Sequence, residues 1–175
     1  VQGFPLGLVW GMLASRAGEI RVLSWNLDGL DERFLHVHAR TLDTDTPLSL
    51  LTSHLESTKQ CADERKRQLM TLFEEAASSG RPALVGGDLN IRDPEAKECL
   101  QYASQRGWAF HDAWEQAGDQ DSRWTFDMQT NVNFKSRGAG SLLRCAPRIR
   151  FDRVYASCGT FADFELGGTQ PLAQG

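Results

Sequence analysis

The chain has 175 residues, of which 41% are hydrophobic and 24% charged, a composition typical of one globular domain that can bury a core. With 19 Lys and Arg against 23 Asp and Glu, its formal net charge of −4 excludes a protein that binds nucleic acid through overall charge, so any contact with DNA must be local. The nine Phe and five Trp exclude an intrinsically disordered chain.

The first apolar stretch, Leu6 to Ala14, is too short to span a bilayer and has no basic residue before it, as a secretory signal would. We therefore expect an intracellular protein without a membrane partner. The next stretch, from Ile20 to Leu23, is rich in β-prone residues and leads into Asn26 and Asp28, where turn residues begin. It predicts a strand that places polar residues at its end.

Residues Phe34–Ala39 alternate with period two, and a second apolar run follows over Leu48–Leu51. The polar residues and proline between them predict a turn, so the two runs together predict a β-hairpin. His36 and His38 share one strand face, as pairs of metal ligands can, but the sequence places no third ligand near them. We interpret both histidines as hairpin surface.

A surface helix is predicted over Ala62–Ala77, because Leu69, Leu72, Phe73 and Ala76 recur at helical spacing. We interpret its charged residues, Arg65 among them, as lying away from that apolar stripe. A short buried strand over Pro82–Val85 leads into Gly86-Gly87-Asp88.

A second helix is predicted over Pro94–Gln105 after an N-cap at Asp93, and a last strand over Arg148–Tyr155. This order of elements predicts a layered α/β (α+β) protein with antiparallel sheet content. Residues 1–19 are expected to be poorly defined, 20–157 to form the domain, and 158–175 to form a disordered tail, because periodicity is lost there. The cysteines at 61, 99, 145 and 158 are far apart and match no zinc spacing, which predicts free thiols in a reducing compartment.

Three polar clusters follow predicted strands: Asn26 with Asp28, His54 with Glu56, and Asp88 with Asn90. Sheets bring such ends together, and the glycines before Asp88 allow a phosphate or metal to approach the backbone. Oxygen donors of this kind suit Mg²⁺. Any one pair alone is more often a pair of turn residues.

Four blocks of sequence carry a more specific signal. They are Ser24-Trp25-Asn26-Leu27-Asp28-Gly29-Leu30, Thr52-Ser53-His54-Leu55-Glu56-Ser57-Thr58, Gly87-Asp88-Leu89-Asn90-Ile91-Arg92-Asp93 and Arg150-Phe151-Asp152-Arg153. In this order they resemble the exonuclease, endonuclease and phosphatase superfamily, and more narrowly its 5′-tyrosyl-DNA phosphodiesterase branch. The resemblance covers about residues 20 to 155 and implies a four-layer α/β/β/α sandwich, incomplete in this chain.

The resemblance implies a role for each matching residue. Asp28 would help to hold Mg²⁺, with Mn²⁺ as an alternative ion, and Asp88 would orient or deprotonate the attacking water. Asn90 would hold the scissile phosphate, and His54 would donate a hydrogen bond to it as charge develops. Asp152 would orient a catalytic histidine. The remaining implied positions contact the substrate; they are Asn26, Leu27, Gly29, Leu30, Leu55, Glu56, Ser57, Thr58, Lys59, Ile91, Arg92, Phe126 and Phe151, the last two forming an apolar wall for an end nucleotide.

Each role has a structural alternative. His54 on its own would more often be an ordinary histidine near a strand end. Asp152 and Arg153 could form a weak surface ion pair. The run Lys135–Arg153 holds six basic residues and one acidic residue, which could steer a DNA backbone or simply form a solvated loop.

The chain departs from the family pattern in two places. After the first block the family has a long segment whose Gln-Glu glutamate is the principal Mg²⁺ ligand, whereas here Glu32 runs directly into Arg33. The family also ends with a Ser-Asp-His-Trp block that does not occur here. We interpret these differences as an internal deletion and a C-terminal truncation, and each loss predicts a drop in turnover of about 100-fold or more.

Three hypotheses follow. The first is a nuclear, and also cytoplasmic, monomeric Mg²⁺-dependent enzyme that hydrolyses the phosphotyrosyl bond between a DNA 5′ end and trapped topoisomerase II in double-strand break repair, with negligible or weak turnover by this chain. The second is a catalytically dead isoform that acts by binding alone. The third is another phosphodiesterase or endonuclease of the same superfamily.

Overall fold

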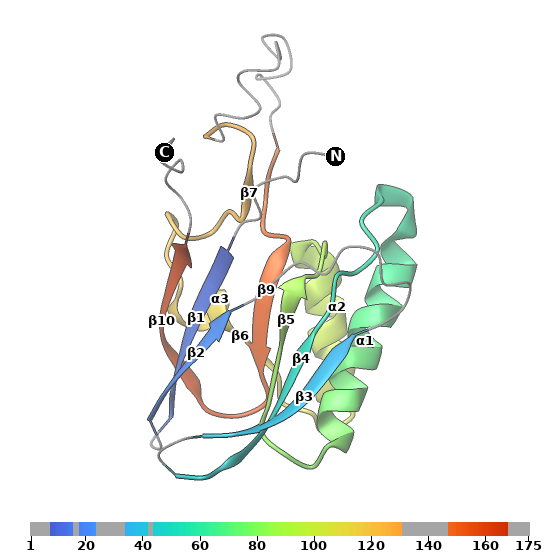
Figure 1. Ribbon diagram of the computed structural model, residues 1–175. Helices are drawn as coiled ribbons and strands as arrows, with labels where there is room; N and C mark the ends of the chain where they lie inside the picture. Colours follow the sequence, from blue (N-terminus) through green and yellow to red (C-terminus); the bar gives the residue numbers. More distant parts are fainter. Residues whose placement is uncertain (1–7, 16–17, 24–33, 42–43, 131–146, 168–175) are drawn as a thin grey trace, which may run out of the picture.

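A computed structural model describes residues 8–15, 18–23, 34–41, 44–130 and 147–167, the first two ranges as backbone only. Three layers are visible in Figure 1: a helix pair, a five-stranded sheet and a three-stranded sheet. The mixed α/β class and the incomplete sandwich predicted from the sequence are thereby confirmed. None of the described helices is long and apolar enough to cross a membrane.

The central five-stranded sheet has the order β3-β4-β5-β9-β6. Its strands are β3 (Leu35–Arg40), β4 (Pro47–Thr52), β5 (Ala83–Asp88), β9 (Asp152–Ala156) and β6 (His111–Asp112). β3 and β4 pair antiparallel, which confirms the predicted hairpin, while β4 and β5 run parallel. β9 pairs antiparallel with both β5 and β6. The carboxyl ends of β4 and β5 therefore lie side by side, next to the start of β9.

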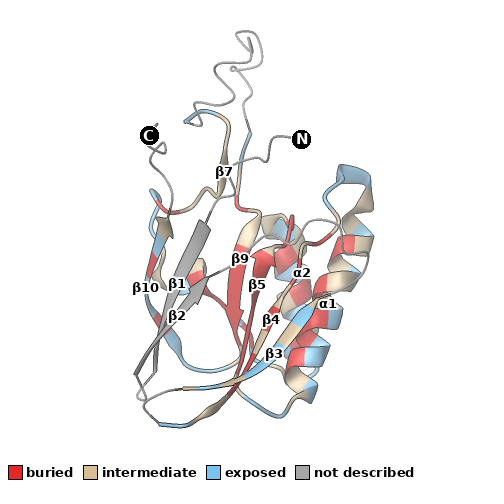
Figure 2. Ribbon diagram, in the orientation of Figure 1, coloured by how far each residue is buried: buried red, intermediate tan, exposed pale blue. Residues whose placement is uncertain are grey.

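Helices α1 (Ala62–Ser78) and α2 (Asp93–Gln105) cover one face of this sheet (Figure 1). The apolar stripe predicted for α1 is buried against the sheet, together with alternate residues of the strands such as Val85 and Tyr155 (Figure 2). The intervening residues, such as Leu84 and Val154, face a second cluster on the other side. Period-two alternation thus supplies two cores from one sheet.

The second cluster lies against strand β10 (Thr160–Gly167) and the short helix α3 (Ala113–Ala117). β10 forms a three-stranded sheet with β1 (Leu8–Ser15) and β2 (Gly18–Leu23). Phe161 and Phe164 of β10 are buried, so the structure differs from the expected disordered tail over this strand. β1 likewise occupies part of the segment expected to be poorly defined. The reason is long-range pairing, because β1, near the start of the chain, pairs antiparallel with β10, near its end.

Two further boundaries differ from expectation. Helix α2 begins at Asp93 with Arg92 before it as the N-cap, so an N-cap at Asp93 is wrong by one residue. The strand predicted over Arg148–Tyr155 is split into β8 (Arg148–Ile149), which pairs with β7 (Phe126–Asp127), and β9. The remaining element is a 3-10 turn, η1, over Lys59–Cys61. The described cysteines, Cys61, Cys99 and Cys158, are free thiols.

Candidate active site

The end of β5 passes very close to the loop that follows β4. Gly87 has a φ of 145°, and a Cβ at this position would lie 2.1 Å from the carbonyl oxygen of Ser53. Glycine is therefore required here both by the backbone conformation and by the contact. The next residues are joined as well, since the Leu55 amide donates to the Asp88 carbonyl at 3.1 Å. The Gly-Gly-Asp sequence thus brings the two predicted polar clusters together.

His54 and Asp88 face each other across this junction. The Nε2 of His54 lies 3.7 Å from Oδ2 of Asp88, and each side chain is 23% exposed. An imidazole and a carboxylate at this distance, both accessible to water, can contact the two sides of one polar ligand. The isolated reading of His54 as an ordinary strand-end histidine does not account for this pairing with a second predicted site residue.

Asn90 closes the same junction from the β5 side. It is 6% exposed and has a φ of 47°, a left-handed conformation that asparagine tolerates better than most residues. Its backbone N–H donates to Oδ1 of Asp88 at 3.3 Å, and its Nδ2 donates to the Leu55 carbonyl at 3.0 Å. Asn90 therefore fixes the loop that carries His54 as well as the carboxylate of Asp88.

Asp152, at the start of β9, stands directly opposite Asp88 in the β5–β9 register. Burial, and after it the charge of Asp88, raise the pKa of Asp152, a hydrogen bond from Thr125 opposes both, and the resulting pKa is about 7. The Thr125 hydroxyl oxygen also accepts the N–H groups of Phe151 and Asp152, each at 3.0 Å. Sequence reasoning missed Thr125, because a threonine in a loop more than twenty residues away carries no pattern that points to this strand.

Phe126 and Phe151 lie together, with ring centroids 5.5 Å apart and planes inclined by 52°. The guanidinium of Arg92 lies 5.9 Å from the centroid of Phe151, which adds a cation to this aromatic pair. Leu55 and Ile91 are buried at 4% and 0% exposure in the core cluster under α1 and α2. Their side chains therefore support the loops, and only their backbone could face a ligand.

The segment after Leu55 is exposed but ordered by its own hydrogen bonds. One carboxylate oxygen of Glu56 accepts from the N–H groups of Ser57 and Thr58, at 3.1 and 3.3 Å, and from the Thr58 hydroxyl. Lys59 follows as the first residue of η1 and is exposed. The predicted substrate-contacting segment therefore lies at the surface beside the His54–Asp88 junction.

Arg153 does not form a surface ion pair with Asp152, so that alternative is wrong. It is 2% exposed, and its guanidinium contacts Asp112 at 3.1 Å, the carbonyl of Ile91 at 3.3 Å, and Asp93. Arg150, equally buried, also pairs with Asp112. This buried network joins β9 to the start of α2, and so links Asp152 to the segment that contains Asn90.

The predicted residues of the first block, Asn26, Leu27, Asp28, Gly29 and Leu30, lie outside the described residues. Within the described ranges, no group of three or more His, Cys, Asp or Glu side chains could hold a metal ion. The carboxylates of Asp88 and Asp152 nevertheless provide oxygen donors of the type that Mg²⁺ prefers. Burial first, and then the charge of Asp88, raise the pKa of Asp152, and a bound cation would act against both effects.

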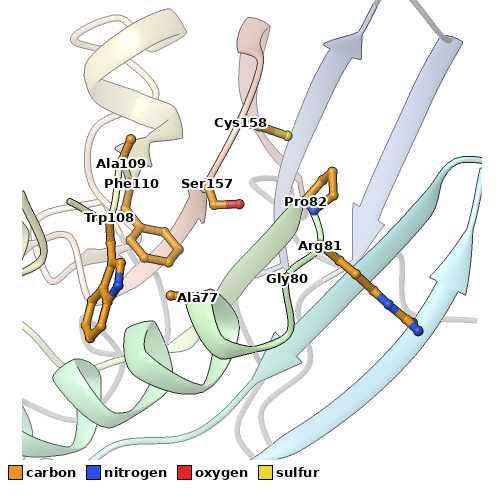
Figure 3. Close-up of a pocket in the computed structure, with 9 residues that line it drawn as sticks. All are labelled: Ala77, Gly80, Arg81, Pro82, Trp108, Ala109, Phe110, Ser157 and Cys158. Carbon is orange, nitrogen blue, oxygen red and sulfur yellow. The ribbon is translucent and has the colours of Figure 1, made fainter. Parts of the chain in front are cut away.

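A hollow of about 370 Å³ opens at the other end of β5 (Figure 3). Its lining includes Arg81 and Pro82, which precede β5, and Ser157 and Cys158, which follow β9; the other lining residues are Ala77, Gly80, Trp108, Ala109 and Phe110. None of these is a predicted site residue. The candidate site is thus defined by converging polar groups at the opposite end of the strand.

The chain is similar in sequence to curated tyrosyl-DNA phosphodiesterases. No family model matches the chain. It is 34% identical to tyrosyl-DNA phosphodiesterase 2 of Rattus norvegicus over 109 residues, which cover 61% of this chain and 27% of the relative. The human tyrosyl-DNA phosphodiesterase 2 is 33% identical over 111 residues, covering 62% of this chain and 28% of the relative. The chain therefore spans about a quarter of the length of the curated relatives that it matches.

Solved structures give the same similarity. The D. rerio TDP2 structure complexed with single strand DNA product superposes with a TM-score of 0.63 at 25% identity, covering 80% of this chain and 55% of that one. Truncated Caenorhabditis elegans TDP2, at 22% identity, covers 96% of this chain and 61% of that one with a TM-score of 0.58, and shows the same fold. The predicted resemblance to tyrosyl-DNA phosphodiesterases is confirmed: the chain is similar to them in sequence and in fold.

Proposed function

We propose that the chain is a phosphodiesterase that hydrolyses the 5′-phosphotyrosyl bond between a protein adduct and a DNA end. The observation that carries this proposal is the convergence of His54, Asp88 and Asp152 at the carboxyl end of β5. The curated relatives that this chain resembles are tyrosyl-DNA phosphodiesterases, which supports this substrate over other phosphate esters.

In the proposed reaction, Asp88 orients or deprotonates the water that attacks phosphorus, and the tyrosine oxygen leaves. His54 donates a hydrogen bond to a phosphate oxygen as negative charge builds up, and Asn90 fixes the loop against which the phosphate rests. The DNA product keeps its 5′ phosphate. Mg²⁺, or Mn²⁺ in its place, would supply charge neutralisation when bound, with Asp28 helping to hold it.

The end nucleotide is proposed to lie against Phe126 and Phe151, where a base can stack on an aromatic ring. Arg92 beside Phe151 would contact the phosphate backbone. The D. rerio TDP2 structure with a single strand DNA product supports a DNA end as the ligand. We further propose topoisomerase II adducts as the protein partner, a monomeric state, and location in the nucleus and cytoplasm.

Turnover by this 175-residue chain is expected to be slow. The family glutamate that is the principal Mg²⁺ ligand has no counterpart after the first sequence block, so the ion would be weakly fixed. This same feature motivates the alternative in which the chain only binds DNA ends. The two proposals differ in one measurable quantity, the release of tyrosine.

The test uses the purified chain with a single-stranded oligonucleotide that carries a 5′-phosphotyrosyl group, in Mg²⁺ and in EDTA. Mg²⁺-dependent release of tyrosine is expected, and Asp88→Asn should lower it by about 100-fold or more. Asp45→Asn, at an exposed ion pair in the β3–β4 turn, is the matched control and should leave the rate unchanged. Abasic DNA and a lipid phosphodiester serve as competing substrate classes.

Absence of tyrosine release from the wild-type chain would overturn the catalytic proposal. Binding of a 5′-phosphorylated oligonucleotide in preference to its 5′-hydroxyl counterpart would then support the binding-only alternative. Faster cleavage of the abasic or lipid substrate would assign the chain to another phosphodiesterase activity.

A further inference from the structure

A fully buried arginine lies behind the candidate site. Arg65, in the first turn of α1, is 0% exposed. It lies one helical turn before Leu69 and two turns before Leu72, on the same face as the apolar stripe, so the interpretation that it falls away from that stripe is wrong. Burying a guanidinium destabilises the fold unless its N–H groups have hydrogen-bond partners. The partners of Arg65 therefore indicate its structural role.

One side of the guanidinium holds the loop that follows His54. Its Nη1 donates to the carbonyl oxygens of Glu56 and Thr58, each at 2.9 Å. This loop is already attached at its beginning, where the Leu55 amide and carbonyl bind Asp88 and Asn90. Arg65 provides the second attachment, at the far end of the segment.

The other side of the guanidinium holds the start of α2. Nε and Nη2 donate to the two carboxylate oxygens of Glu95, at 3.0 and 2.9 Å, as a bidentate pair. Glu95 in turn accepts the backbone N–H of Arg92 at 3.1 Å. Burial alone would raise the pKa of Glu95, but hydrogen bonds from Arg65 and from the Arg92 amide lower it below its usual value. The carboxylate is thus charged and held between two parts of the chain.

We propose that Arg65 is a positioning residue, which fixes the His54 loop relative to the Asn90–Arg92 segment and so sets the spacing between His54 and Asp88. This inference rests on the proposed function for its catalytic consequence, but its structural part does not require turnover. Two loops from different strands end on one guanidinium, and each of those loops begins at the His54–Asp88–Asn90 junction. Loss of Arg65 would remove the bonds to the Glu56 and Thr58 carbonyls and release the Glu95 carboxylate, leaving the bond from the Glu56 N–H to Gln68 Oε1, at 3.0 Å, at that end of the His54 loop.

The variants separate positioning from simple stability. Arg65→Met removes every donor while keeping an apolar stem, and Arg65→Lys keeps the charge but cannot reach Glu95 and both carbonyls together. Glu95→Gln keeps acceptor and donor groups, and leaves the bonds from Arg65 to the loop carbonyls in place. Arg67→Met is the matched control, because Arg67 lies two residues along α1, is 56% exposed in its side chain and pairs with Glu64 on the same helix.

The readout is the imidazole NMR spectrum, which contains only four histidines, with the His54 signal assigned through His54→Gln. Arg65→Met should shift or broaden the His54 signal and leave those of His36, His38 and His111 unchanged. Hydrogen exchange of the loop amides from Leu55 to Thr58 should become about tenfold faster or more, since bonds from a charged donor are lost. Arg65→Lys should restore part of both effects, and Arg67→Met should produce neither.

An unchanged His54 signal and unchanged loop exchange in Arg65→Met would overturn the proposal. So would a uniform acceleration of exchange throughout the chain, which would assign Arg65 to global stability alone. If Arg65→Met does not fold, Arg65→Lys decides by the same two measurements.

Where tyrosine release is measurable, kcat should fall by about 10- to 100-fold in Arg65→Met, with KM changing far less, because the geometry of the reacting groups is altered more than binding. If the wild-type chain releases no tyrosine, the proposed function fails while the NMR and exchange results still decide the role of Arg65. A rise in KM with kcat unchanged in Arg65→Met would contradict the proposal that Arg65 positions His54.

Discussion

Asp152 stands opposite Asp88 across the antiparallel β5–β9 pair, so two carboxylates from strands more than sixty residues apart share one end of the sheet. The backbone N–H of Asp152 is bound by Thr125, which fixes the start of β9 at this place. Two acidic groups in a partly buried position cannot both ionise without cost. The Asp88–Asp152 pair therefore destabilises the fold at the place where the candidate site lies.

The unfolding free energy should fall as pH rises from about 4 to 7. Burial, with the charge of Asp88 added, raises the pKa of Asp152 from 3.8 to about 7, so in this range the folded chain keeps a proton that the unfolded chain has lost. Asp152→Asn removes this effect. Its stability relative to the wild type should rise by up to about 1.4 kcal/mol per pH unit between pH 4 and 7, measured by urea unfolding in EDTA.

Above pH 7 the difference between Asp152→Asn and the wild type should become constant, since Asp152 is then ionised in both states. Asp88→Asn should move the pH dependence to lower pH, because it removes the neighbouring charge that raises the pKa of Asp152. A difference that does not vary with pH would show that Asp152 titrates normally in the folded chain.

Gly87→Ala should destabilise the chain by about 3 kcal/mol or more. The added Cβ would meet the Ser53 carbonyl oxygen at 2.1 Å, between two backbone segments that cannot both move without breaking the β4–β5 junction. The control is Gly80→Ala, where φ is +63° but no atom lies within 4 Å of the new Cβ, so only about 1 kcal/mol of backbone strain is expected. Equal losses in urea unfolding would show that conformation, and not the contact with Ser53, decides the requirement for glycine.

Local patterns predicted those parts of the fold that depend on neighbours in sequence. The spacing of Leu69, Leu72 and Phe73 fixes which face of α1 is buried, and that face is the same in any context that offers a core. The hairpin of β3 and β4 is equally local. The pairing of β1 with β10 is not local: most of the chain separates the two strands, so the sequence of one gives no signal that identifies the other as its partner.

The candidate site divides in the same way. Asp88 ends β5 and His54 lies two residues beyond the end of β4, so their closeness could be predicted from their places in the sequence. Thr125 and Arg65 could not, since their roles arise from hydrogen bonds to backbone groups that only the folded chain brings near. Arg65 lies on the buried face of α1 by its spacing to Leu69 and Leu72, but only the folded chain shows which groups accept its hydrogen bonds.

Asp112→Asn should cost about 3 kcal/mol or more of unfolding free energy. Asp112 has a side chain 2% exposed and pairs with both Arg150 and Arg153, so its loss leaves two buried guanidinium groups with only the more exposed carboxylates of Asp93 and Glu115 as partners. The asparagine oxygen can still accept the Trp114 N–H that begins α3, so the change tests charge rather than capping. Asp45→Asn, which breaks an exposed pair with Arg40, should leave the midpoint of the same urea titration nearly unchanged, because water screens that pair.

The outer edge of the five-stranded sheet is the last feature with a measurable consequence. β3 is the outermost strand, and its Leu35 and Val37 are exposed at 50% and 41%, the large hydrophobic residues that are exposed within the described part of the chain. An accessible strand edge with an apolar face promotes association between molecules. Val37→Lys should therefore reduce the light-scattering increase at rising protein concentration, without lowering the urea midpoint.

The matched control for this change is Thr71→Lys, at an exposed position of α1. Each substitution brings the net charge of −4 one unit closer to zero, which by itself favours association. A decrease in scattering confined to Val37→Lys must then come from the β3 edge, where a lysine opposes strand pairing. Equal behaviour of the two variants would show that association involves another surface, and that the exposed face of β3 is tolerated as it stands.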